Sequence, residues 1–220
     1  MSDITEEAIS KTFLTSLRHA GEHHHPYRHW LLDHCLPEDM VDALMALPFV
    51  PPQIDDTKGR RETNNDSRIH FGPQYRNQHP VMDTLARVFH SREVADAVKE
   101  ATGASLTGTS LRIEYCQDSD GFWLEPHTDI GVKKFTMLVY LNREPEGADW
   151  GTDMYYDSNT HFGRAPSAFN AGLIFIPSDK TWHGFEKRPL HGVRKSLIIN
   201  YVGPEWRSRH ELCFPEATIP

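Results

Sequence analysis

Apolar residues recur at helical spacing in the first half of the chain. Helices are predicted over residues 3–20, 37–47 and 80–102. In the first of them Ile9, Phe13 and Leu17 form a single stripe that can face a core. The third region is expected to restart at Ser91, a favoured N-cap residue, and to end at Gly103. The N-terminal half is therefore predicted to be largely helical.

From about residue 105 the apolar residues alternate with polar ones instead, as they do on strands with one buried face. Strands are predicted at residues 111–116, 135–141, 153–156, 172–176 and 194–202. Helices followed by many short strands indicate an α+β protein with a β-sandwich or jelly-roll core. We find no internal repeat and no linker, so residues 1–220 are expected to form a single domain. Its parts would be residues 1–104 with the helices, 105–203 with the β core, and a tail at 204–220.

Composition narrows the classes of function. The chain has 23 basic and 31 acidic residues, a net charge of -8, so nucleic acid is not an expected partner. No apolar run approaches the roughly 18 residues of a membrane helix. The three cysteines are scattered and the N-terminus is acidic, unlike a secretory signal, so we expect a cytoplasmic protein without a disulfide framework.

Four residues of the β region together suggest a metal site. His127 and Asp129 are two apart on an extended segment and therefore project to the same side. His183 follows a later strand, and Arg194 opens the strand after that. Two imidazoles and one carboxylate leave coordination positions open, which suits non-haem Fe(II), whereas zinc prefers a closed set that often includes thiolates. An arginine nearby offers a fork for a carboxylate, so the site would take a metal-chelating co-substrate with a distal carboxylate.

This order of residues resembles the Fe(II)/2-oxoglutarate-dependent oxygenases, in the branch that contains the prolyl hydroxylases. The strand that carries Tyr115 and the strand at residues 135–142, which ends in Tyr-Leu-Asn, are also similar to that branch. So, more loosely, is the segment that begins at Pro26, which resembles an entry strand and helix. The resemblance implies a double-stranded β-helix, a jelly-roll or cupin-like core, with the N-terminal helices packed on one sheet.

The resemblance also implies the roles of residues. His127, Asp129 and His183 would bind Fe(II), and Arg194 would pair with the 5-carboxylate of 2-oxoglutarate. The remaining residues expected to face the co-substrate are Tyr115, Thr136, Leu138, Tyr140 and Asn200.

The implied reaction is hydroxylation of an unactivated C–H bond in a small polar molecule or an amino-acid-like substrate. It would consume O2 and 2-oxoglutarate, release succinate and CO2, and be stimulated by ascorbate. The alternatives are a prolyl-type protein hydroxylase and a non-catalytic, cupin-like metal-binding or sensing protein. Asn200 stands where the nucleic-acid-dealkylating branch carries a second arginine, which argues against nucleic-acid substrates. The oligomeric state is not indicated.

The polar segment at residues 55–71 is either an exposed loop or a lid over the site. As a lid it would grip a polar, anionic substrate through charge-assisted hydrogen bonds. The residues that could do so are Arg60, Arg61, Asn64, Asn65 and Arg68. Trp123 and Trp182 each lie within four residues of an expected metal ligand and either wall the site or belong to the core.

Overall fold

The structure is a computed structural model that describes residues 4–60, 68–143, 145 and 147–220. Its helices are α1 (Glu6–Arg18), α2 (Glu38–Met45), α3 (Pro73–Gln78), α4 (Pro80–His90), α5 (Arg92–Thr102) and the 3-10 helix η2 (Arg209–Glu211). Its strands are β1 (Gly21–His23), β2 (His29–Leu32), β3 (Ile69–His70), β4 (Ser110–Asp118), β5 (Leu124–His127), β6 (Lys133–Tyr140), β7 (Asp153–Tyr155), β8 (His161–Arg164), β9 (Gly172–Phe175), β10 (His183–Phe185) and β11 (Arg194–Val202).

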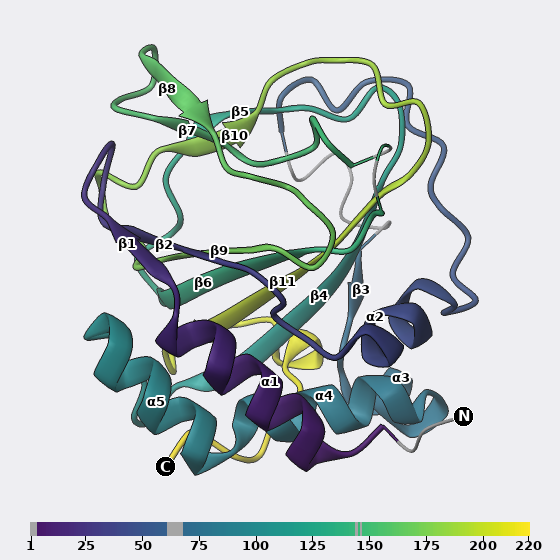
Figure 1. Cartoon of the computed structure of the whole chain (residues 1–220), viewed down its shortest axis with the longest axis vertical. Coiled ribbons are helices and arrows are strands. Elements are labelled where there is room, and N and C mark those ends of the chain that lie inside the picture. The colour runs from purple at the N-terminus through teal and green to yellow at the C-terminus, as the bar shows by residue number, and fades with distance from the viewer. Residues whose placement is uncertain (1–3, 61–67, 144, 146) are drawn as a thin grey trace.

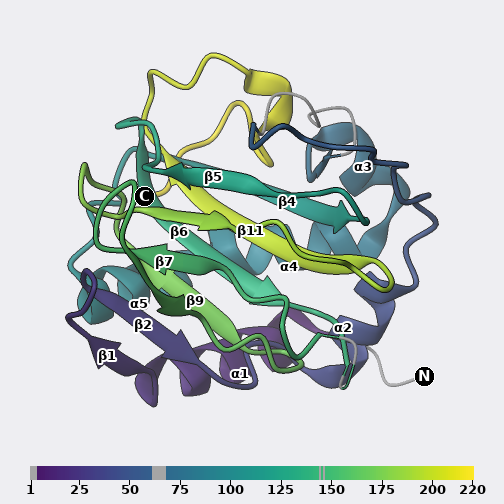
Figure 2. The same ribbon diagram turned by 90° about the horizontal axis from the view of Figure 1, so that it is seen from above.

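The strands form two sheets, and the helices cover one of them. The larger sheet has the order β1-β2-β9-β6-β11-β4-β3, and the smaller sheet has the order β5-β10-β7-β8. Every pairing between the described strands is antiparallel. Figure 1 shows the helices along the outer face of the larger sheet and the smaller sheet on its other side. The view from above shows the smaller sheet lying over the central strands β11 and β6 (Figure 2).

The predicted helix boundaries are confirmed where local chemistry defines them. The Ser91 hydroxyl accepts a hydrogen bond from the backbone N–H of Val94 at 3.3 Å and so caps α5. Gly103 ends α5 in the left-handed conformation, with φ of 76°, which glycine adopts without steric cost. The short helix α3 was not predicted, because none of its residues is buried and it has no apolar stripe to detect.

The alternation predicted for the β region divides each central strand between two environments. On β11, Leu197, Ile199 and Tyr201 are fully buried in the core between the larger sheet and the helices. Ser196, Ile198 and Asn200 alternate with them in sequence and therefore face the smaller sheet. Most of the apolar core is thus on the helix side, while the space between the sheets combines smaller apolar clusters, which include Leu138 and Phe185, with buried polar residues.

The residues after β11 return to the sheet. The backbone N–H of Cys213 donates to the carbonyl of Leu111 at 2.9 Å, and that of Ile219 donates to Thr109 at 2.8 Å. The predicted tail therefore lies along the start of β4. Within the part of the chain that the structure describes, none of the helices has the length and apolar character to cross a membrane.

Candidate active site

The two predicted histidine ligands lie on neighbouring strands of the smaller sheet. His127 ends β5 and His183 opens β10, and the two are direct cross-strand partners with ring centroids 4.5 Å apart. Asp129 follows β5 by two residues. The ligand atoms of the three side chains all lie within 4.8 Å of one another. The tertiary structure thus brings together three groups that the sequence places up to 56 residues apart.

Backbone carbonyls hold both imidazoles in one orientation. The Nδ1 atom of His127 lies 2.8 Å from the carbonyl oxygen of Glu125, and that of His183 lies 2.9 Å from the carbonyl oxygen of Thr181. Each Nδ1 therefore carries the proton, which leaves Nε2 as the ligand atom. Burial lowers the pKa of His183 to about 4, so this ring is neutral at physiological pH, as a metal ligand must be.

The carboxylate of Asp129 is also held from two sides. The Thr136 hydroxyl donates to Oδ2 at 2.9 Å, and the Lys133 ammonium forms an ion pair with Oδ1. The Asn200 side-chain amide donates in turn to the Thr136 hydroxyl at 2.9 Å. Thr136 and Asn200 are buried, with 2% and 0% of their surface exposed. Both residues, expected to face the co-substrate, thus form a chain of hydrogen bonds that orients a candidate metal ligand.

Arg194 lies in the same cavity as the three candidate ligands. Its Nε donates to the carbonyl of Trp150 at 2.7 Å and its Nη1 to Oδ2 of Asp118 at 2.6 Å. We call this narrow space between the sheets, about 50 Å³, the inner cavity. The residues that line it are Arg68, Phe122, Leu124, His127, Asp129, Lys133, Thr136, Leu138, Thr152, His183, Gly184, Phe185, Arg194 and Ile198.

The inner cavity adjoins a wider space of about 520 Å³, which we call the outer hollow. Its lining includes Leu124, His127, Asp129 and Lys133, which also line the inner cavity. The other residues of its lining are Gly59, Arg60, Arg112, Glu125, Pro126, Thr128, Ile130, Trp206, Ser208 and Glu211. One face of the candidate metal site is therefore accessible to a molecule larger than a co-substrate.

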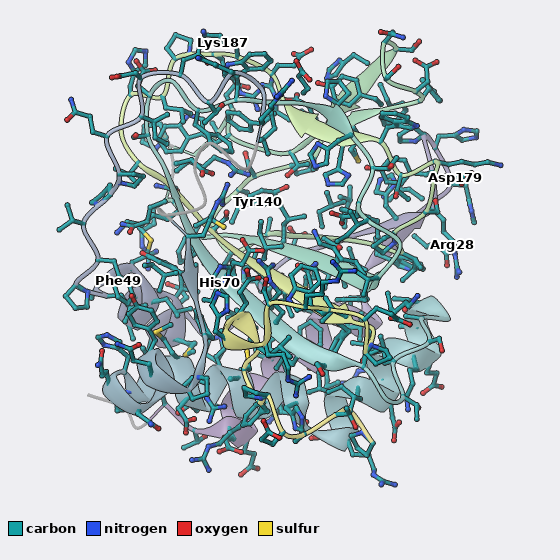
Figure 3. The ribbon with its side chains drawn as sticks, turned by 180° about the vertical axis from the view of Figure 1, so that it is seen from behind. Arg28, Phe49, His70, Tyr140, Asp179 and Lys187 are labelled. Carbon is teal, nitrogen blue, oxygen red and sulfur yellow. The ribbon has the colours of Figure 1, made fainter. Side chains whose placement is uncertain are left out.

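The two tyrosines expected to face the co-substrate differ in position. Tyr140 lies between the sheets, as Figure 3 shows, where its hydroxyl donates to Thr152 at 3.0 Å and its ring lies 5.8 Å from the Arg194 guanidinium. Tyr115 instead belongs to the core on the helix side, 6.1 Å from the ring of Phe49. Among the described residues that line the two spaces, Tyr115 does not appear, because odd-numbered residues of β4 face the helices.

The residues of the polar segment that were expected to bind substrate lie in different places. Arg61, Asn64 and Asn65 lie outside the described residues. Arg60 lines the outer hollow, whereas Arg68 is buried in the inner cavity.

The described part of this segment packs closely against the strand that ends in His127. The backbone N–H of Glu125 donates to the carbonyl of Gly59 at 3.0 Å, and a Cβ at Gly59 would lie only 2.4 Å from the Glu125 side chain. Trp123 donates from Nε1 to Asp56 at 2.6 Å and so fastens the segment in place. Neither Trp123 nor Trp182 is among the described residues that line the two spaces.

Sequence reasoning missed several buried charged residues around the site. Arg112, Glu114 and Asp118 alternate along β4 on the face toward the smaller sheet, and each has at most 5% of its surface exposed. The Arg112 guanidinium forms ion pairs with Glu114 and Glu211. A signal for them was present in the sequence. These charged residues occupy the polar positions of a predicted strand, and charged side chains that a central strand buries require partners.

A second group of potential ligands contains Asp153, His161 and Glu186. The Asp153 carboxylate already accepts from Arg188 at 2.6 Å and from Arg164 at 3.1 Å. Burial would raise the pKa of Asp153, but the hydrogen bonds from Arg188 and the Glu186 N–H outweigh it and hold that pKa below its ordinary value. This carboxylate is therefore neutralised by arginines, and the group is a structural ion-pair cluster.

The fold of this chain also occurs in proteins of known structure. No protein-family model matches the sequence, and no curated protein matches it significantly. Among solved structures, a prolyl 4-hydroxylase of Phytophthora capsici has a TM-score of 0.60 at 18% identity, over 93% of this chain and 68% of its own. A Pseudomonas putida prolyl-4-hydroxylase has a TM-score of 0.56 at 17% identity, over 92% and 99%. A Trichoplax adhaerens prolyl hydroxylase, in complex with a peptide fragment of a hypoxia-inducible factor, has a TM-score of 0.54 at 15% identity, over 90% of each chain. The chain therefore has the fold of the prolyl hydroxylases.

Proposed function

We propose that the protein is an Fe(II)- and 2-oxoglutarate-dependent dioxygenase. The observation that carries this proposal is the convergence of His127, Asp129, His183 and Arg194 on one cavity between two sheets. Bound Fe(II) would supply the activation of O2 that oxidises an unactivated C–H bond while 2-oxoglutarate is converted to succinate and CO2. The neighbours' fold supports the further proposal that the two sheets form a double-stranded β-helix within a single domain.

The donor set fits this metal. Two imidazoles present Nε2 because their Nδ1 atoms are hydrogen-bonded to backbone carbonyls, and one carboxylate is oriented by Thr136. Three such ligands on one side leave positions for exogenous ligands, the pattern of non-haem Fe(II) sites. The three cysteines of the chain are all buried, and none belongs to this group, so the thiolate ligands favoured by structural zinc are missing from it.

The lining of the inner cavity is chemically suited to an elongated dianion. Arg194 provides a buried guanidinium for the distal carboxylate of 2-oxoglutarate, and it is fixed in place by Trp150 and Asp118. Leu138 and Phe185 add apolar surface beside the arginine, which suits the methylene groups of the co-substrate and excludes water. Ascorbate as a stimulant follows from the need to keep iron reduced.

For the primary substrate, we propose a prolyl-type residue within a peptide, in preference to a free small molecule. The outer hollow is large enough to admit a segment of polypeptide beside the metal ligands, and it carries the aromatic Trp206 and the exposed Ile130 at its edge. The neighbours named above are prolyl hydroxylases, one of them in complex with a peptide. A free amino-acid-like molecule is the second candidate, because Arg60 also lines the hollow and offers a guanidinium for a carboxylate.

The test is succinate formation from 2-oxoglutarate under air with Fe(II) and ascorbate, first alone and then with proline-containing peptides or free amino acids. Mass spectrometry should detect the gain of one oxygen atom by a peptide, and by free proline if the second candidate is correct. The Asp129→Ala variant is the matched control and should produce no succinate above background. Fe(II) binding without any succinate would refute the dioxygenase and favour a metal-binding or sensing protein.

A further inference from the structure

Arg68 lies on the same side of the larger sheet as the candidate site. β3 pairs with β4 so that Ile69 lies opposite Tyr115, and both side chains pack toward the helices. Because successive residues of an extended segment face opposite sides, Arg68 points toward the smaller sheet. It has 7% of its surface exposed and lines the inner cavity together with Arg194.

Arg68 and Arg194 share one carboxylate. Asp118 lies directly opposite Arg194 in the register of β4 and β11 and is fully buried. Its Oδ2 accepts from Nη1 of Arg194 at 2.6 Å, and its Oδ1 lies 3.3 Å from Nη2 of Arg68. Asp118 is thus shared between two guanidinium groups. Glu114, another acid on this face of β4, also acts on Arg68 electrostatically, but its ion pair is with Arg112.

The Arg68 guanidinium is not saturated by this contact. Its Nε is buried and has no hydrogen-bond partner among the described residues. The ring of Phe122 lies 5.5 Å from the guanidinium carbon and closes one side of it. A buried donor without a partner is costly, so this arrangement is expected where an anionic ligand completes it.

We propose that Arg68 is a second anchoring residue for the distal carboxylate of the co-substrate, beside Arg194, with Asp118 positioning both guanidinium groups. This inference rests on the proposed function. It moves Arg68 from the primary substrate, where the sequence suggested a role, to the co-substrate.

The test compares two 2-oxoacids as ligands of the Fe(II)-loaded protein without O2. Pyruvate keeps the 1-carboxylate and keto oxygen of 2-oxoglutarate but has no distal carboxylate. In the Arg68→Gln variant, the Kd of 2-oxoglutarate should rise about 30-fold or more, because a buried charge-assisted pair is lost, while the Kd of pyruvate stays within about twofold. Arg87→Gln is the matched control, since the Arg87 side chain is 58% exposed on α4, and it should change neither Kd.

Each outcome decides a different point. An unchanged Kd for 2-oxoglutarate in folded Arg68→Gln would overturn the inference, and so would an equal loss of affinity for both ligands, which indicates a structural role. If Arg68→Gln does not fold, Arg68→Lys keeps the charge and tests the geometry. It should weaken 2-oxoglutarate selectively, and equal effects on both ligands would again overturn the inference. A wild-type protein that binds neither 2-oxoacid would instead refute the proposed function itself.

Discussion

Replacing Thr136 by valine tests whether the hydrogen bonds around Asp129 set the affinity of the site for metal. Valine has nearly the same shape but lacks the hydroxyl that donates to Oδ2 of Asp129 at 2.9 Å. The change also removes the nearer of two acceptors of the fully buried Asn200 amide, which donates to the Thr136 hydroxyl at 2.9 Å and to the Phe135 carbonyl at 3.3 Å. The substitution therefore affects the orientation of one metal ligand without changing any ligand.

The expected magnitude follows from the charge of the acceptor. A hydrogen bond to a charged group contributes about 1.5–3 kcal/mol, which corresponds to about a 10- to 150-fold change in an equilibrium constant. Loss of a residue that orients a metal ligand weakens metal binding by about 10- to 100-fold in other sites. We therefore expect the Kd for Fe(II) to rise by about 10- to 100-fold in Thr136→Val.

The measurement is equilibrium binding of Fe(II) without O2, with thermal unfolding of the metal-free protein alongside. Thr84→Val is the matched control, because Thr84 lies on α4, on the helix side of the larger sheet, and its hydroxyl donates to the carbonyl of Pro80. Wild-type affinity in a folded Thr136→Val protein would show that Asp129 needs no orientation by this hydroxyl and would refute the prediction.

Four further outcomes follow from the structure. Asp129→Ala should abolish Fe(II)-dependent succinate formation while circular dichroism stays native, and normal turnover would refute the ligand assignment. Arg194→Ala should raise the 2-oxoglutarate requirement by about 30-fold or more and spare Fe(II) binding, since about 2–5 kcal/mol is lost with a buried charge pair; an unchanged KM would move the anchoring role elsewhere. Lys133→Met should lower the free energy of unfolding of the metal-free protein by about 3–5 kcal/mol, because it removes the ion-pair partner of Asp129. Adding metal should then raise the Tm of this variant more than that of the wild-type protein, and a smaller rise than in the wild type would contradict this. Ser91→Ala should lower the free energy of unfolding by about 1 kcal/mol through loss of the α5 cap, with activity unchanged, and denaturant unfolding would measure it.

Local chemistry in the sequence was sufficient for most of the elements and for the choice of candidate metal ligands. Ser91 and Gly103 mark helix ends because capping and the left-handed conformation depend on the residue itself. Strand alternation places Leu197 and Ile199 on one face and Asn200 on the other whatever the rest of the chain does. His127 and Asp129 could be paired in advance because they are only two residues apart.

Tertiary structure decided which side chains share a charge and which face the site. The sequence contains no sign that Arg68 and Arg194 share Asp118, because the contact depends on the register of β3, β4 and β11. Tyr115 shows the same dependence: its place on the helix side follows from which face of β4 the helices cover. Helices and strands arise from neighbouring residues, but electrostatic partners in the interior arise from strand pairing between distant segments. Which strands pair over long separations in sequence depends on the apolar surface that the whole sheet buries. It also depends on the free-energy cost of leaving a buried charge without a partner.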